Sequence, residues 1–175
     1  PLILEALISN KADLLNKCIG GWPDLPEGTS LLNFTACHDG VGLRPLDGLM
    51  DKKRLKKLLN ECEKRGGLIS YRSSNDGKDE PYEINISWWS AMVDDIDKNE
   101  GLQLRRFLLS QLLVMSIKGI PAFYLQAILA SNNDIETFRC TGNRRDLNRK
   151  KYDFYELPVL LDDDDSNQSK VLSYL

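Results

Sequence analysis

The 175-residue sequence has little of what marks membrane, secreted or nucleic-acid-binding proteins. Its most apolar stretch, Phe107–Ala130, is interrupted by Lys118 and Pro121, and so it lacks the roughly 20 apolar residues in a row of a membrane span. The first apolar run is broken by Glu5, and no small-residue cleavage site follows it, which argues against a signal peptide. The formal net charge of −3 lacks the basic surplus that a nucleic-acid binder normally carries.

Cysteine is scarce, and the sequence has no clear cofactor motif. The chain has four cysteines: Cys18, Cys37, Cys62 and Cys140. Because none of them forms a C-x-x-C pair, we expect reduced, mostly buried thiols in a cytoplasmic protein. The G-V-G-L-R-P segment at 40–45 lacks the third glycine of a dinucleotide fingerprint, and the acidic run at 162–165 is typical of a solvated loop. We therefore expect neither an organic cofactor nor a metal.

What the sequence does have is the composition of a globular domain, or of part of one. It is 42% hydrophobic and 28% charged, far from disordered composition, and its length suits about one domain. Pro1 is not an initiator methionine, and Ser166–Leu175 has the capping residue and apolar spacing of a helix that is only beginning. We expect both ends to be cuts inside a larger domain, so that residues 1–175 form part of it. A small complete protein is the alternative.

Apolar strands alternate with helices along the chain. Buried strands are expected at Ser30–Ala36 and Ile120–Leu125, which are short apolar runs bounded by turn residues. Helices are expected at Asp51–Arg65, at Gln103–Ile117, and, as one broken or two short helices, at Leu2–Ile8 and Ala12–Ile19. Because Gln103–Ile117 is apolar nearly all round, we expect it to be buried on most sides.

This alternation predicts parallel strands and an α/β architecture. A (β/α)8 barrel typically needs about 250 residues, so 175 residues with two good strands fill only part of one. We expect irregular structure at His38–Met50, a polar loop at Ser73–Pro81 and a charged loop with short helical turns at Arg139–Tyr155. Leu68–Arg72 is a candidate short strand.

The only histidine, His38, follows the expected strand Ser30–Ala36 directly and precedes Asp39. At the carboxyl end of a parallel strand, such a pair is well placed to meet a substrate. The histidine can donate to a hydroxyl, and the aspartate can face a developing cation. A structural histidine satisfied within its loop is the alternative. Cys37 does not complete a thiol triad, because neighbouring residues on a strand point to opposite faces.

Aromatic and basic residues are further candidates. Tyr82-Glu83 and Trp88-Trp89 follow a polar loop, and aromatic faces beside a carboxylate suit sugar rings; core packing is the alternative for the tryptophans. A basic cluster comes later in the chain: Arg139, Arg144, Arg145, Arg149, Lys150 and Lys151. It forms either a solvated face or, through one or two of its arginines, a site for an oxyanion such as phosphate.

Several segments, in their order along the chain, carry a resemblance to a known family. They are L-N-F-T-A-C-H-D-G-V-G-L-R-P-L-D-G-L (Leu32–Leu49), P-Y-E-I-N-I (Pro81–Ile86), G-I-P-A-F-Y-L (Gly119–Leu125), A-S-N-N-D (Ala130–Asp134) and T-G-N-R-R-D-L-N-R (Thr141–Arg149). The first resembles the seventh-strand motif of the α-amylase superfamily (glycoside hydrolase family 13), in the longer form of sucrose phosphorylases and their relatives. The glutamate of P-Y-E-I-N is similar to that of glucosylglycerate phosphorylases rather than the sucrose-specific enzymes.

The resemblance implies the C-terminal portion of a (β/α)8 TIM barrel, about strands seven and eight. It also implies a retaining transfer of an α-glucosyl group to inorganic phosphate, which gives α-glucose 1-phosphate. Asp39 would stabilise the oxocarbenium-like transition state, and His38 would hydrogen-bond the same glucose. Arg145 would contact the bound glucose, whereas Tyr82 and Glu83 would line the acceptor or phosphate side.

In the family, the nucleophilic aspartate and the acid/base glutamate lie upstream of these segments. We therefore expect this chain alone to be inactive, although the protein it comes from is an enzyme. Its partners would be an α-glucoside and phosphate, without nucleic acid or membrane. A hydrolase or transglucosidase of the same superfamily is the alternative among enzymes. An alternative of another class is a non-catalytic half-barrel that binds a partner or assembles with itself through exposed strand edges.

Overall fold

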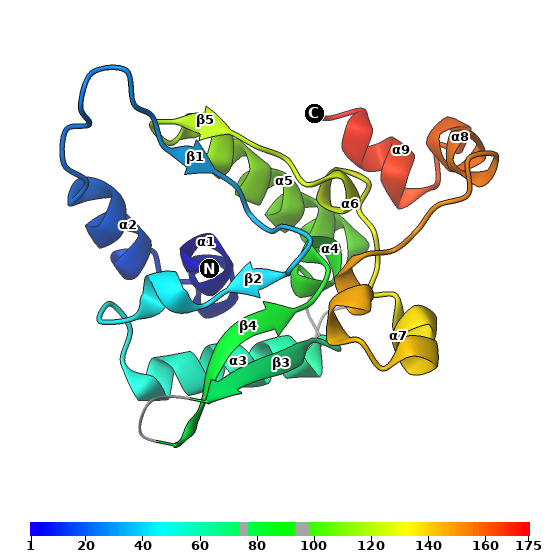
Figure 1. The fold of residues 1–175 in the computed structure, drawn as a ribbon. Coiled ribbons are helices and arrows are strands. Elements are labelled where there is room, and N and C mark those ends of the chain that lie inside the picture. Colours follow the sequence, from blue (N-terminus) through cyan, green and yellow to red (C-terminus); the bar gives the residue numbers. More distant parts are fainter. Residues whose placement is uncertain (74–76, 94–98) are drawn as a thin grey trace.

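The computed structural model describes residues 1–73, 77–93 and 99–175, with helices and strands mixed along the chain (Figure 1). The helices are α1 (Leu2–Ser9), α2 (Asp13–Gly20), α3 (Lys52–Lys64), α4 (Trp88–Ala91), α5 (Glu100–Ser116), α6 (Leu125–Ile128), α7 (Ile135–Thr141), α8 (Glu156–Asp162) and α9 (Asn167–Leu172). The strands are β1 (Leu32–Asn33), β2 (Val41–Gly42), β3 (Leu68–Ser73), β4 (Asp79–Asn85) and β5 (Ile120–Pro121). Short 3-10 helices are η1 (Arg44–Leu46) and η2 (Arg144–Asn148).

Strands β1 and β5 form a parallel pair, as the alternation of strands and helices predicts. Leu32–Asn33 pairs with Ile120–Pro121, and the two strands lie side by side in Figure 1. The Asn33 side chain reinforces the pair, because its Nδ2 donates to the carbonyls of Ile117 and Lys118 at 3.2 and 3.1 Å. Strands β1 and β5, which are far apart in the sequence, are thereby held parallel to each other.

The prediction that these two strands are buried is wrong, and both are shorter than the segments predicted. Each has two residues, inside the longer runs Ser30–Ala36 and Ile120–Leu125. Leu32 and Ile120 are 62% and 57% exposed. The physical reason is that, in the part of the chain that the structure describes, the pair has no third strand beside it. Its apolar side chains therefore remain in contact with water.

A second sheet is antiparallel, in the order β2-β4-β3, and it corrects two loop predictions. Strand β2 lies within His38–Met50, which was expected to be irregular, and β4 begins at Asp79, within the expected loop Ser73–Pro81. Residues 74–76 of that loop lie outside the described residues. Strand β2 is too short to show an alternating pattern, which is why the sequence does not reveal it. The short strand predicted at Leu68–Arg72 is confirmed as β3.

Helix α3 confirms the prediction for Asp51–Arg65. The Asp51 side chain caps it by accepting a hydrogen bond from the backbone N–H of Arg54 at 2.8 Å. Its buried residues are Leu58, Leu59 and Cys62. This apolar stripe packs towards the core on the side of β3, and the lysines lie on the outer faces.

An ion-pair network ties the two short N-terminal helices to α3. Arg54 donates to both oxygens of Glu5, at 2.6 and 2.8 Å, and to both oxygens of Asp13, at 2.7 and 2.8 Å. Glu5 is buried, and a buried carboxylate needs such a partner. The hydrogen bonds from Arg54 lower the pKa of Asp13 to about 2.

Helix α5 is apolar nearly all round, but the prediction that it is buried on most sides is wrong. One face is buried, at Phe107, Ser110, Gln111 and Val114. The opposite face carries Leu109, Leu112 and Met115, which are 47%, 56% and 43% exposed. Among the described residues, the core lies on one side of this helix only.

No helix of the described residues combines the length and hydropathy that crossing a bilayer requires.

The segment Arg139–Tyr155 is a loop region with short helical turns, as predicted, because α7 ends and η2 lies within it. Asp134 caps α7 by accepting from the N–H of Thr137 at 3.0 Å, and Asn143 caps η2 by accepting from the N–H of Arg145 at 3.2 Å. Between the two elements, Gly142 ends α7 with a φ of +69°. Arg145 lies in η2, one of the short helical turns of this segment.

The four cysteines are free, as predicted for reduced thiols. The prediction that they are mostly buried is wrong, since only Cys62 is buried, Cys18 and Cys37 are partly buried, and Cys140 is exposed. Burial raises the pKa of the Cys62 thiol to about 12. The thiolate is the reactive form, and Cys62 therefore has almost none of it at neutral pH.

Thiol labelling tests this packing. In the folded chain at pH 8, we expect an aromatic disulfide reagent to modify Cys140 in a fast phase and Cys62 only after unfolding in urea. A Cys140→Ser variant should lose the fast phase, and a Cys62→Ser variant should keep it. Loss of the fast phase in the Cys62→Ser variant would contradict the core packing of α3.

Candidate functional site

His38 and Asp39 occupy the tip of a tight turn between β1 and β2. The backbones of Cys37 and Gly40 close this turn, with N–H to carbonyl distances of 3.2 and 2.9 Å. Gly40 has a φ of +103°, and a Cβ built on it would lie 2.3 Å from the carbonyl oxygen of Ile84 in β4. Only glycine has this freedom and this lack of bulk, so Gly40 sets the turn directly against the antiparallel sheet.

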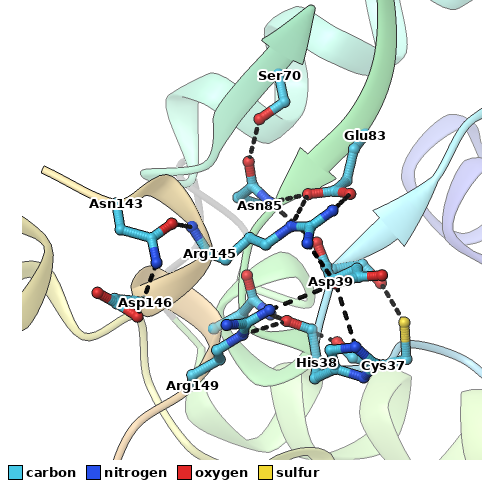
Figure 2. A network of polar contacts seen from close by, with 12 residues as sticks. Cys37, His38, Asp39, Ser70, Glu83, Asn85, Asn143, Arg145, Asp146 and Arg149 are labelled. Atoms are coloured by element: carbon cyan, nitrogen blue, oxygen red, sulfur yellow. Dashed lines mark hydrogen bonds and ion pairs between the residues drawn. The ribbon is translucent and has the colours of Figure 1, made fainter.

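Arg145 of η2 bridges Asp39 and Glu83, as Figure 2 shows. Its Nε and Nη2 donate to the two carboxylate oxygens of Glu83 at 3.2 and 3.0 Å, a bidentate contact. Its Nη1 lies 2.9 Å from Oδ1 of Asp39. Hydrogen bonding to Glu83 is the main reason why the pKa of Arg145 is raised above its usual value, with Asp39 adding to the effect.

Glu83 is the buried member of this group. Its side chain is 5% exposed, whereas those of Arg145 and Asp39 are 38% and 37% exposed. Asn85 also donates to Glu83, and Ser70 in turn donates to the Asn85 side-chain oxygen at 2.6 Å (Figure 2). The buried carboxylate is thus satisfied by one guanidinium and one amide, which offsets the penalty of removing it from water.

A second arginine, Arg149, reaches the same turn. Its Nε donates to the carbonyl oxygen of His38 at 2.7 Å, and its Nη2 lies 3.4 Å from Oδ1 of Asp39. The His38 ring nitrogen Nε2 is 3.3 Å from the same oxygen, and the ring itself is 68% exposed. Two carboxylates therefore face two guanidinium groups, and both His38 and Asp39 remain accessible to a ligand.

The parallel pair explains why these residues meet. The turn with His38 follows β1, and η2 follows β5 after α6 and α7. Because parallel strands send the segments after them to the same edge of a sheet, the two segments converge there. The candidate site is thus assembled from the segments that follow two neighbouring strands and from the buried carboxyl-terminal half of β4.

Four of the five residues singled out from the sequence are brought together: His38, Asp39, Glu83 and Arg145. The fifth, Tyr82, is half-buried beside them, and its phenol contributes to the raised pKa of Arg145. In the pairing of β3 with β4, Tyr82 is the extra residue of a β-bulge, because Ser70 pairs with Glu83 and the next residue pairs with Pro81.

The interpretation of Trp88-Trp89 as a sugar platform is wrong. Both rings are buried, at 2% and 4% exposure, and Trp89 packs edge-on against Phe107 with ring centroids 5.4 Å apart. Trp88 Nε1 donates to the Ser110 hydroxyl at 2.7 Å, which satisfies its only polar group. The alternative of core packing is confirmed.

Sequence reasoning missed three polar residues at the site. Asn85, Asn148 and Arg149 lie within the segments that carry the family resemblance, but the sequence assigns none of them a role. Asn85 donates to the Asp39 carbonyl at 2.9 Å, and Asn148 donates to the His38 carbonyl at 3.0 Å. For Asn85, the spacing from Glu83 was a usable signal, since residues two apart on a strand share a face. Nothing comparable marks Asn148.

The chemistry of this donor set suits a polar organic ligand. Carboxylates, guanidinium groups and an accessible imidazole can hydrogen-bond hydroxyls and oppose charge that develops on a ligand. In the described parts of the chain, no three side chains of metal-binding type come together.

Comparisons with known proteins show what the chain is similar to. The chain is 33% identical to glucosylglycerate phosphorylase from Escherichia coli over 164 residues, which cover 94% of this chain and 29% of that protein. The chain is a homologue of the glucosylglycerate and sucrose phosphorylases. It is also 28% identical to sucrose phosphorylase from Streptococcus mutans over 158 residues, which cover 88% of this chain and 30% of that enzyme.

A solved crystal structure supports this relationship. The structure of sucrose 6F-phosphate phosphorylase from Thermoanaerobacter thermosaccharolyticum matches with a TM-score of 0.75 and 26% identity, over 98% of this chain and 32% of that one. No family model matches the chain. The phosphorylase homologue spans about three tenths of the length of these relatives. The resemblance drawn from the sequence motifs is confirmed.

Two glycine substitutions test how the His38–Asp39 turn of the phosphorylase homologue is held. Gly40→Ala places a Cβ in contact with β4 at a positive φ, and we expect it to lower the free energy of unfolding by about 2 kcal/mol or more. Gly42→Ala is the matched control, because a Cβ there meets nothing within 4 Å; its change should stay within about 0.5 kcal/mol. Urea unfolding measures both, and equal effects would contradict the close approach of Gly40 to β4.

Proposed function

We propose that residues 1–175 are one part of the catalytic domain of a retaining α-glucoside phosphorylase. In this proposal, β1 and β5 are neighbouring strands of a (β/α)8 barrel, about the seventh and eighth, and the remaining strands lie in the part of the protein that corresponds to the unmatched length of the relatives. The parallel register of β1 and β5 and the phosphorylase activity named for the relatives support it.

The network of Asp39, Arg145 and Glu83 carries the proposal. Asp39 is the carboxylate that binds the glucose hydroxyls and stabilises the positive charge of the oxocarbenium-like transition state. His38, exposed beside it, donates a hydrogen bond to the same sugar. Arg145 contacts the glucose and holds Asp39 in place. Tyr82 and Glu83 line the side of the acceptor or phosphate.

The reaction balances with no cofactor. A retaining mechanism needs a nucleophile and an acid/base about 5–5.5 Å apart, and this proposal assigns both to the rest of the protein. The anomeric carbon first passes from the glycosidic oxygen to the nucleophile, while the acid protonates the leaving group. An oxygen of inorganic phosphate then attacks the anomeric carbon, the bond to the nucleophile breaks, and the acid/base group takes the phosphate proton, which gives α-glucose 1-phosphate and restores both carboxyl groups.

The substrate that we propose is an anionic glycoside of the glucosylglycerate type. A carboxylate at Glu83 would repel the carboxylate of glycerate if it stood alone. Arg145 contacts Glu83 through two N–H groups, which neutralises this charge at short range. With Arg149 close by, the site is not acidic on balance and is compatible with an anionic acceptor.

The decisive assay is phosphorolysis by the full-length protein that contains this chain. We expect α-glucose 1-phosphate to form from glucosylglycerate and phosphate, and more slowly from sucrose. Asp39→Asn should lower kcat by about a hundred- to a thousand-fold. Asp47→Asn, on an exposed residue eight positions later in the chain, is the control and should leave kcat unchanged. Sugar release that does not depend on phosphate would instead show a hydrolase or transglucosidase.

The 175-residue chain should be inactive by itself, because the proposed nucleophile and acid/base are outside it. The comparison is with a His38→Ala/Asp39→Ala double variant of the same chain. Turnover of the unaltered chain above that control would overturn this assignment of the two carboxylates.

A second candidate, of another class, is a non-catalytic module that assembles with itself. The observation in its favour is the exposed apolar face of α5, at Leu109, Leu112 and Met115, next to the exposed strand pair. Light scattering of the purified chain tests it, and a clean monomer would count against self-assembly.

A further inference from the structure

The backbone of the His38–Asp39 turn is held by side chains as well as by its own hydrogen bonds. Three carbonyls in a row accept from side-chain donors, at Cys37, His38 and Asp39. Asn148 donates through Nδ2 to the first two, at 3.4 and 3.0 Å, and Asn85 donates to the third at 2.9 Å. The turn is therefore fixed from η2 on one side and from β4 on the other.

Asn148 differs from an ordinary packing residue. It is 3% exposed, and among the residues that the structure describes its Oδ1 has no hydrogen-bond partner. Burying an unpaired amide oxygen is unfavourable, and a leucine of similar shape would avoid it. What a leucine cannot supply is the Nδ2 donor that reaches Cys37 and His38. The residue is thus suited to holding the turn rather than to filling space.

We infer that Asn148 is a positioning residue that sets the direction of the Asp39 carboxylate. Asn148 lies on η2, the element that also supplies Arg145, the partner of Asp39. The segment after β5 therefore acts on Asp39 in two ways. Asn148 fixes the backbone of the turn that carries Asp39, and Arg145 contacts the Asp39 carboxylate. The inference deepens the proposed function and rests on it for the catalytic readout.

The test compares Asn148→Leu with a matched variant, Asn133→Leu, in the full-length enzyme. Asn133 likewise joins two segments, since it accepts from the N–H of Ser87 at 2.8 Å and donates to the carbonyl of Arg65 at 3.1 Å, but it makes no contact with the turn in the described structure. We expect Asn148→Leu to lower kcat about ten- to a hundred-fold, with the KM for phosphate changed less than about two-fold, because a displaced Asp39 acts on the transition state. Asn133→Leu should lower the melting temperature and leave kcat near that of the unaltered enzyme.

A second measurement needs no activity. His38 is the only histidine of the 175-residue chain, and so its ring C2–H proton gives an unambiguous NMR signal from the turn. Asn148→Leu should shift this signal in the folded chain, and Asn133→Leu should leave it in place. The two measurements distinguish the proposed function from the role of Asn148. If the unaltered full-length protein shows no phosphorolysis, the proposed function is rejected, and the NMR comparison still tests whether Asn148 holds the turn.

Three results would overturn the role of Asn148. They are an unchanged kcat in Asn148→Leu, an equal loss of kcat in Asn148→Leu and Asn133→Leu, or an unmoved His38 signal in folded Asn148→Leu.

Discussion

The candidate site depends on the ion pair between Glu83 and Arg145. A carboxylate as buried as that of Glu83 is unfavourable unless a donor of opposite charge reaches it, and Arg145 does so with two hydrogen bonds. This requirement fixes η2 against β4. Once the guanidinium is fixed there, its third contact falls on Asp39. The position of the exposed Asp39 carboxylate thus follows from the need of the buried Glu83 carboxylate for a charged hydrogen-bond donor.

The fold brings these groups together with few elements. Parallel pairing of β1 and β5 sends the His38–Asp39 turn and η2 towards the same edge. The glycine at position 40 then lets the turn approach β4 closely enough for Asn85 to reach the Asp39 carbonyl. Side chains from separate parts of the sequence complete one polar network, and neighbouring apolar side chains such as Ile84 and Ile86 are fully buried.

Local patterns predicted the parts of the structure that local physics determines. Helix α3 could be recognised because its apolar stripe repeats at helical spacing and Asp51 caps it. The parallel relation of β1 and β5 followed from alternating strands and helices. Strand β2 could not be recognised in the same way, since two residues carry no periodicity. The exposure of one face of α5 could not be predicted either. The sequence shows that this face is apolar, but it does not show whether another element covers it.

The residues of the candidate site likewise fall into those that local sequence patterns can reveal and those that they cannot. His38 and Asp39 could be selected from their place after a strand. Tyr82, Glu83 and Arg145 stood out as aromatic, acidic and basic candidates, and the motif resemblance gave each of them a role. Asn148 could not be selected, because its contacts are with Cys37 and His38, more than a hundred residues earlier in the chain. Long-range contacts of this kind become visible only when the two strands are paired.

The most direct test of the central interaction is a double-mutant cycle on the free energy of unfolding, with Glu83→Gln, Arg145→Gln and the double variant. A buried, bidentate pair predicts a coupling energy of about 1–3 kcal/mol. The exposed pair Lys118 and Asp24, 4.0 Å apart, is the control and should couple by less than about 0.5 kcal/mol. If the effects of Glu83→Gln and Arg145→Gln simply add within that limit, the buried ion pair does not hold η2 to β4, and the account of the site is wrong.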